Sequence, residues 1–177
     1  MKIAATISAV LLAIGLFNIA AHATTIWTGP PVTFTKLDNG DWQLPQNQDR
    51  LTSHVWITRK GTQGIYNIQQ ETGYAHGVSP KGTAWAYGSA ANWTSLTFQP
   101  WETWAAHDPP LTVGRPAVMH LLAEDIYLDV KFLYWSSGHG DGGGGFSYVR
   151  SSIPEPSGLA LLGAGAIGLL GRARRRP

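Results

Sequence analysis

The sequence predicts an all-β fold, an antiparallel, jelly-roll-like β-sandwich over residues 24–152, flanked by an N-terminal signal peptide and a short C-terminal transmembrane helix. Residues 125–135 alternate apolar and polar side chains, the period of two expected of a half-buried strand. Other short strand-like runs are separated by Gly, Pro, Asn or Asp, a spacing typical of sandwiches. No long window within 24–152 carries a helical period, so we expect helices only as brief connectors.

The segment 125–135 gives the clearest strand. Its alternation places Asp129 and Lys131 on the solvent face, and the buried face should carry Ile126, Leu128, Val130, Phe132 and Tyr134. Other strands are expected at 32–36, 54–58, 64–68, 84–87, 95–99, 117–122 and 146–150.

Two loops are predicted from turn residues. Asn39-Gly40 accepts positive φ at both central positions, so it is interpreted as a hairpin turn. The glycine-rich run 138–145 occurs once and lacks the fixed period of calcium-binding glycine repeats, which favours a long loop joining the last two strands.

The N-terminus has the organisation of a secretory signal peptide over residues 1–23. Lys2 supplies a positive charge, residues 3–20 are almost wholly apolar, and Ala21-His22-Ala23 is an A-x-A cleavage site. Cleavage by signal peptidase after Ala23 should start the mature chain at Thr24.

The C-terminus, residues 153–177, combines a proline box, an uncharged apolar run over about 158–171 and a basic cluster. The residues that define it are Pro154, Glu155, Pro156, Arg172, Arg174, Arg175 and Arg176. A 14-residue helix spans roughly 21 Å, short of the roughly 30 Å hydrocarbon core, so it would be a marginal anchor. The arginines should stay in the cytoplasm, which places the domain across the inner membrane. A run of this length also suits a buried core helix, but the proline box and the arginines favour the membrane segment.

This tail resembles the PEP-CTERM sorting signal of Gram-negative bacteria. The resemblance implies recognition by an exosortase, transient anchoring in the inner membrane, and then a place at the cell surface or outside the cell. It also implies a host that makes exopolysaccharide. Phrases within the domain, among them 29–34, 55–59, 120–132 and 144–152, resemble a family of secreted bacterial β proteins of unassigned activity. That second resemblance supports export and fold alone.

Charge and cysteine content exclude several classes of function. Between Thr24 and Ser152 eight Lys and Arg face ten Asp and Glu, scattered along the chain, so nucleic acid is not expected as a partner. The chain has no cysteine, which rules out disulfides, thiolate metal sites and thiol nucleophiles. Gly163 to Gly168 match G-x-G-x-x-G, but the apolar tail offers no strand before them, so no dinucleotide cofactor is predicted.

Eight tryptophans, all in the mature domain, support two interpretations. They can fill the core of a cysteine-free sandwich, or an exposed row can stack on sugar rings. Trp101 and Trp104 lie in a polar, proline-bounded stretch, so they are the pair expected to be exposed and to bind a glycan.

Candidate catalytic residues lack supporting motifs, and neither catalytic nor metal-binding residues are predicted. Ser53, His54, His107-Asp108 and His120 have no Gly-x-Ser-x-Gly elbow, and His120 with Glu124 lacks the His-Glu-x-x-His pattern. A glycosidase needs two carboxylates across a cleft. Residues of that type are present at Glu102, Glu124, Asp125 and Asp129.

The sequence therefore predicts an exported, exosortase-processed protein with a non-catalytic binding or structural role, in contact with exopolysaccharide. The alternative is a secreted glycan-active hydrolase or lyase. Two carboxylates close together beside Trp faces would favour the enzyme, whereas a flat aromatic platform would favour the binding module.

Overall fold

The computed structural model describes residues 23–137 and 143–153. The predicted signal peptide up to His22, including Ala21, lies outside the described residues. So do the proline box, the apolar run and the arginine cluster of the tail, namely Pro154, Glu155, Pro156, Arg172, Arg174, Arg175 and Arg176. The part of the chain that is described contains no helix long and apolar enough to cross a membrane.

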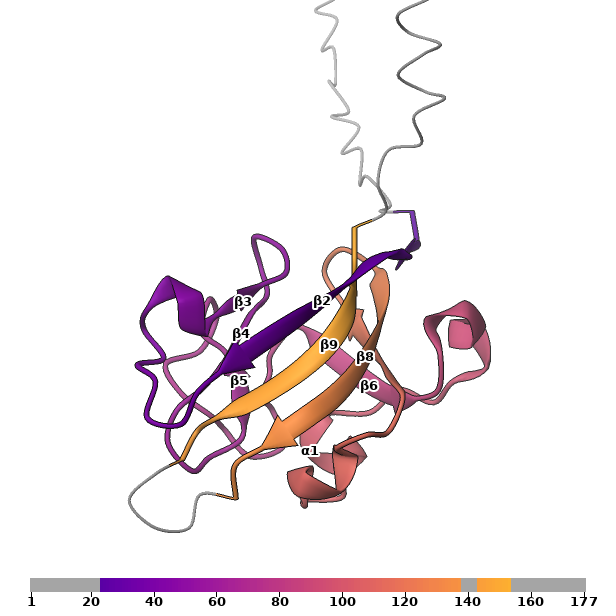
Figure 1. Ribbon diagram of the computed structural model, residues 1–177. Coiled ribbons are helices and arrows are strands. Elements are labelled where there is room, and N and C mark those ends of the chain that lie inside the picture. The colour runs from indigo at the N-terminus through magenta and orange to yellow at the C-terminus, as the bar shows by residue number, and fades with distance from the viewer. Residues whose placement is uncertain (1–22, 138–142, 154–177) are drawn as a thin grey trace, which may run out of the picture.

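Six strands form the large sheet, in the order β2-β9-β8-β7-β6 with β1 beside β8 (Figure 1). All of its pairings are antiparallel except that of β1 with β8, which is parallel. Because β7 occupies one edge of β8, β1 and β9 share the other edge, β1 along its first half. The strands are β1 (Thr25–Trp27), β2 (Gly29–Lys36), β6 (Thr83–Tyr87), β7 (Ala117–Leu121), β8 (Ile126–Trp135) and β9 (Phe146–Ser152).

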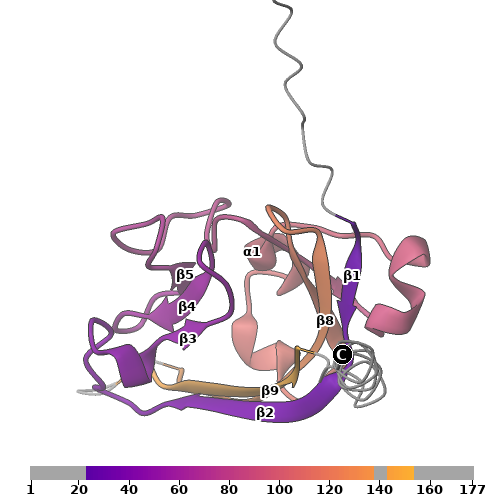
Figure 2. The ribbon, with the colours of Figure 1, turned by 90° about the horizontal axis from the view of Figure 1, so that it is seen from above.

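A second, antiparallel sheet contains three short strands, β3 (Asp49–Arg50), β4 (Trp56–Arg59) and β5 (Ile65–Asn67). It lies across from the large sheet, which bends so that β2 and β9 form one side of the molecule and β8 and β1 another (Figure 2). Helices are brief, as expected: η1 (Pro45–Asn47), η2 (Ala90–Ser95) and η3 (Pro109–Thr112) are 3₁₀ helices, and α1 (Trp101–Trp104) is one turn.

One hydrophobic core joins the two sheets. The small sheet contributes Ile57 and Ile65, both fully buried, and the large sheet contributes buried side chains from β6 to β9. These include Trp85, Met119, Leu128, Val130, Phe132, Phe146 and Tyr148. The predicted all-β class with antiparallel sheets and little helix is confirmed. The jelly-roll-like sandwich stays a prediction, because the layer opposite the large sheet has only strands of two to four residues.

Strand β8 follows the predicted alternation up to Phe132 and then departs from it. Val130 and Phe132 are buried, as predicted. A β-bulge at Leu133 then shifts the register, since Phe132 pairs with Tyr148 but Tyr134 already pairs with Ser147. The prediction that Tyr134 faces the core is therefore wrong: its side chain is 45% exposed, and Trp135 packs against the core instead.

The outer face of the large sheet is partly covered, which explains the departure of residues 95–99 from the predicted strand. The segment around η2 packs Trp93, Leu96 and Phe98 over Tyr127, whose ring lies 4.4 Å from that of Trp93. Only Gln99 makes a strand-like bridge, to Trp85. The apolar residues of 95–99 serve this small outer cluster, so their pattern resembles that of a strand.

The Asn39-Gly40 pair forms a turn but not the predicted hairpin. Asn39 has φ of 58°, and the Gly40 N–H donates to the Leu37 carbonyl. The chain then continues into η1 and not into a strand that pairs with β2, whose partner is β9. The glycine-rich segment does join the last two strands, β8 and β9, although residues 138–142 are outside the described part.

A buried ion pair links the two sheets. The Arg150 guanidinium on β9 makes two hydrogen bonds of 2.7 Å to the two carboxylate oxygens of Asp49 on β3. The Tyr148 hydroxyl donates a third, of 2.6 Å. Asp49 is 6% exposed, and this bidentate geometry is the strongest form of such a pair.

Candidate functional site

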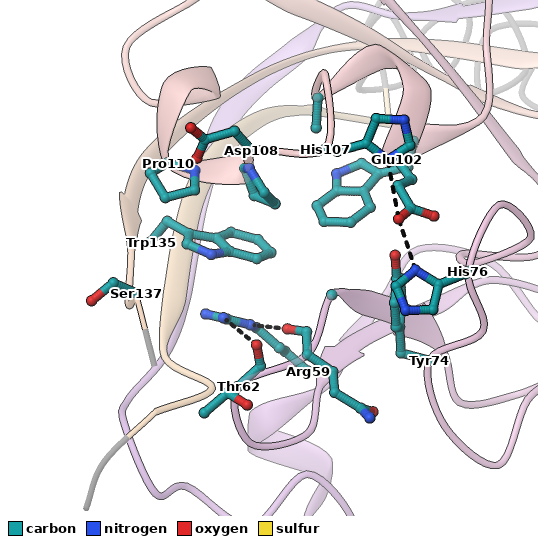
Figure 3. Close-up of a pocket in the computed structure, with 15 residues that line it drawn as sticks. Arg59, Thr62, Tyr74, His76, Glu102, His107, Asp108, Pro110, Trp135 and Ser137 are labelled. Carbon is teal, nitrogen blue, oxygen red and sulfur yellow. Dashed lines mark hydrogen bonds and ion pairs between the residues drawn. The ribbon is translucent and has the colours of Figure 1, made fainter. Parts of the chain in front are cut away.

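The main candidate site is a pocket of about 500 Å³ beside helix α1, which we call the α1 pocket. Its walls come from the end of β4, the loop between β5 and β6, α1 with the loop that follows it, and the end of β8 (Figure 3). The lining side chains used below are Arg59, Tyr74, His76, Glu102, His107 and Trp135.

Helix α1 positions Glu102 at the pocket. The helix starts directly after its N-cap residue, Pro100, and the acidic Glu102 in the first turn complements the positive end of the helix dipole. The two residues after the C-cap, Ala106 and His107, both have positive φ, near 53° and 59°. Such strain in residues other than glycine is often found at functional sites. Here it turns His107 back onto Glu102.

Glu102 is the centre of a hydrogen-bonded cluster. His76 Nδ1 lies 2.8 Å and His107 Nδ1 3.3 Å from the same oxygen, Oε1. The Gly77 N–H donates to Oε2 at 2.5 Å. The carboxylate thereby ties the loop between β5 and β6 to α1, and both histidine rings remain largely exposed.

These contacts settle the charge of Glu102. The His76 hydrogen bond, with help from Gly77, His107 and Tyr74, overcomes the opposing effect of burial and lowers the pKa of Glu102 to about 2. Burial, and next the hydrogen bond to Glu102, raise the pKa of Tyr74. At neutral pH the pocket therefore holds an ionised carboxylate and a neutral phenol.

The opposite wall is built from Arg59 and Trp135. The guanidinium carbon of Arg59 lies 3.9 Å from the Trp135 ring centroid, and Figure 3 shows the indole lying over it with Pro110 beyond. Arg59 also donates to the backbone carbonyls of Gln63, Ser136 and Gly145. Its burial lowers its pKa to about 10, so it stays charged at neutral pH.

A glycine allows the aromatic wall to close. A Cβ on Gly64 would lie 2.4 Å from the Tyr74 ring and 2.8 Å from that of Trp101. The two rings meet edge to face at 6.3 Å. Any side chain at residue 64 would force Tyr74 or Trp101 out of the wall.

The predicted exposed platform of Trp101 and Trp104 is wrong. Their side chains are 2% and 4% exposed, and both belong to the hydrophobic core. Trp104 packs between Trp85 and Tyr87, with ring centroids 5.4 and 4.8 Å away, while Trp101 stacks on Trp135. The stretch is polar because Glu102 faces the pocket, whereas its two indoles lie on the core side of a one-turn helix.

The other candidate residues do not gather at this pocket. His54 contacts Glu124 at 2.8 Å, and His120 contacts Asp125 at 2.9 Å while stacking on Tyr127. Ser53 lies beside His54. Within residues 23–137 and 143–153, no group of three His, Asp or Glu is arranged to hold a metal ion.

Of the sequence candidates, the structure brings together Glu102 and His107, and Asp108 also lines the pocket. Sequence reasoning missed Arg59, Tyr74, His76 and Trp135. No local signal marks them, because they reach the pocket from three separate segments.

Glu102 does not have the properties of a glycosidase acid. A glycosidase acid needs a raised pKa to stay protonated near neutral pH, and the pKa of Glu102 is lowered. Both of its oxygens are already engaged by protein donors. Glu102 therefore orients two histidines and a tyrosine around a polar and aromatic hollow.

Comparisons with known proteins add information about the C-terminal end. Residues 152–176 match the family model described as the PEP-CTERM protein-sorting motif, and the match begins on Ser152, the last residue of β9. No curated protein and no solved structure matches the chain. The motif implies an exported protein that an exosortase recognises. This chain thus carries a PEP-CTERM protein-sorting motif, which follows directly on the last strand of a β domain.

Proposed function

We propose that the domain is a non-catalytic binding module of the cell surface or extracellular matrix, and that the α1 pocket holds a segment of exopolysaccharide. The sorting motif supports export to a place outside the inner membrane. The α1 pocket is the proposed glycan site, in place of the Trp101 and Trp104 platform.

The observation that carries the proposal is the combination of donors, acceptors and aromatic rings around one hollow. A volume of about 500 Å³ suits one or two sugar units. Tyr74, His76 and His107 offer polar edges, while Trp135 and Tyr74 offer apolar ring surface. Sugars present hydroxyl groups around an apolar ring and need both.

Orientation of the pocket groups before binding also supports a binding role. The Glu102 cluster holds His76 and His107 from two loops, so little side-chain freedom is lost when a ligand arrives.

The binding test uses the exported, processed protein, passed over immobilised glycans while soluble products are assayed. His76→Ala should weaken retention at least fivefold, because it removes a donor at the pocket and frees Glu102. His54→Ala is the matched control: this histidine also contacts a glutamate at 2.8 Å and is exposed, but it lies away from the pocket.

Unchanged retention for both variants would place the glycan elsewhere. Retention of no glycan by the wild type would remove the binding role, and release of shortened products would establish the hydrolase or lyase.

The sorting test changes the proline box. With Pro154, Glu155 and Pro156 replaced by alanine in a host with the cognate exosortase, the full-length protein should accumulate in the inner membrane. Membrane fractionation measures this, with Pro177→Ala as the control beyond the arginines. Release and trimming like the wild type would show that the box is not the recognition element.

A further inference from the structure

The first residues of the mature domain meet a carboxylate at the turn between β7 and β8. The Thr24 hydroxyl donates to Asp125 Oδ2, and the Thr25 N–H donates to the Asp125 carbonyl at 2.9 Å. Strand β1 begins here, pairing Thr25 with Ile126 in the parallel arrangement. One aspartate thus contacts the start of β1 through both its side chain and its backbone.

Asp125 is held firmly in this position. Its φ of 52° is positive, and His120 Nε2 lies 2.9 Å from Oδ1, the oxygen that Thr24 does not use. The hydrogen bond from Thr24, and next that from His120, lower the pKa of Asp125 despite burial. The carboxylate is therefore charged at neutral pH and has no Lys or Arg partner among the described residues.

Removal of the signal peptide would change the chemistry at this point. Hydrolysis of the Ala23–Thr24 peptide bond adds one water, leaving a carboxylate on the departing Ala23 and a protonated amine on Thr24. Cleavage also removes the hydrogen bond from Thr25 Oγ1 to the Ala23 carbonyl. The new amine is separated from the Thr24 hydroxyl only by Cα and Cβ, so it arises beside Asp125.

We propose that signal-peptide cleavage creates an ion pair between the Thr24 α-ammonium group and the Asp125 carboxylate, which fastens β1 to the large sheet only in the processed protein. This inference rests on the proposed cleavage after Ala23, and it is independent of the glycan proposal.

The ion pair would matter for stability because strand β1 is short but contributes side chains to the core. Trp27 is 5% exposed and belongs to the main core, and Ile26 packs against the small outer cluster. Three residues of parallel pairing provide few hydrogen bonds to hold them. An ion pair at the strand's first residue opposes fraying of its free end, where order is usually weakest.

The titratable groups that face the new amine are few. Among the described residues they are Asp125 itself and the two groups that contact its carboxylate, His120 on β7 and Tyr127 on β8, which stack on each other at 4.0 Å. The neighbouring Glu124 is engaged by His54.

The pairing predicts a particular pH dependence. An unfolded α-amino group titrates near 8, and a partner carboxylate raises its pKa in the folded state. As long as Asp125 is ionised, the stabilisation is then fully present below about pH 8 and is lost as the pH rises through the higher, folded pKa of the amine.

The experiment moves the amine by one residue without changing anything else. Glycine inserted between Ala23 and Thr24 leaves the A-x-A site intact, so the exported protein should begin with Gly and carry its ammonium one residue further out. Asp125→Asn, in which asparagine tolerates positive φ, removes the carboxylate charge. N-terminal sequencing first establishes where each exported protein starts.

We expect the wild type to start at Thr24 and to melt about 3 to 5 °C above the glycine-insertion variant at pH 7. The difference should shrink by more than half at pH 10, and it should vanish when both proteins carry Asp125→Asn. A start other than Thr24 would overturn the inference through the cleavage site. A start at Thr24 with equal melting, or with a difference independent of pH and of Asp125, would overturn the ion pair and leave export intact.

Discussion

Asp49 and Glu102 are both nearly buried carboxylates held by several donors, yet their partners belong to different parts of the molecule. The partners of Asp49 are Tyr148, which is fully buried, and Arg150, whose side chain is only 11% exposed. The main partners of Glu102 are His76 and His107, whose side chains are 87% and 73% exposed. The first cluster joins two strands of the core, and the second joins two loops at the rim of a pocket.

The difference shows how to separate a carboxylate that supports the fold from one that organises a site. Removing one member of a buried pair leaves an uncompensated charge, which is strongly destabilising. Removing an exposed partner lets water take its place at small cost. The burial of the partners, more than that of the carboxylate, decides which result a substitution gives.

The largest expected effect tests whether one face of α1 packs in the hydrophobic core while the other lines the α1 pocket. Replacing Trp101 and Trp104 together by alanine should prevent folding, because each truncation of a buried tryptophan costs about 3 to 5 kcal/mol. Circular dichroism and the thermal midpoint measure this. A double variant that folds normally and loses only glycan retention would restore the exposed platform.

The next effect concerns the fold-supporting carboxylate. Arg150→Ala should lower the free energy of unfolding by about 3 to 5 kcal/mol in denaturant titrations, since Asp49 is left charged and buried. Arg50→Ala is the matched control, because Arg50 lies over the Trp56 ring as Arg150 lies over that of Trp27, but Arg50 is exposed. Equal losses from both variants would contradict the special role of the Asp49 pair.

A smaller effect concerns Glu102 and has a pH signature. Because its hydrogen bond from His76 lowers its pKa to about 2 from an ordinary 4.5, its stabilisation is present above about pH 4.5 and is lost as the pH falls towards 2. Glu102→Gln should therefore flatten the fall of the thermal midpoint between pH 4.5 and 2. The same slope in both proteins would show that the cluster does not stabilise the ionised form of Glu102 in the folded protein.

The smallest effect lies in the strand that the sequence identified best. Lys131→Ala, on the solvent face of β8, should change the free energy of unfolding by less than about 0.5 kcal/mol, whereas Phe132→Ala should cost about 3 to 5. Denaturant titration of both variants gives the contrast. Comparable losses would mean that the two faces of β8 are not distinct.

Patterns along the chain predict what depends on neighbours in sequence. The alternation of β8 places Val130 and Phe132 in the core, because the period of two is a local property of a strand. Helix α1 cannot be predicted in this way, since four residues are too few to show a helical period. Its proline and glutamate are helix-start signals that a polar loop would also contain.

The candidate sites depend on residues far apart in the chain, which the sequence leaves unpaired. Asp49 and Arg150 are 101 positions apart, and His76 meets Glu102 across 26. Any of the scattered charges could have been partnered with any other before the topology was known. The sorting motif can be predicted from the sequence because all of its residues lie in one continuous segment, 152–176.

The β-bulge at Leu133 decides which side chains at the end of β8 face the α1 pocket. If β8 continued its alternation through Leu133 without a bulge, Trp135 would point outward, away from Arg59, and Tyr134 would face the core. Deletion of Leu133 would remove the bulge and leave Tyr134 opposite Ser147 and Trp135 opposite Phe146, whereas a regular strand that kept Leu133 would exchange the two side chains. The wall of the α1 pocket therefore depends on where the bulge sets the register of β8 as much as on the identity of its residues.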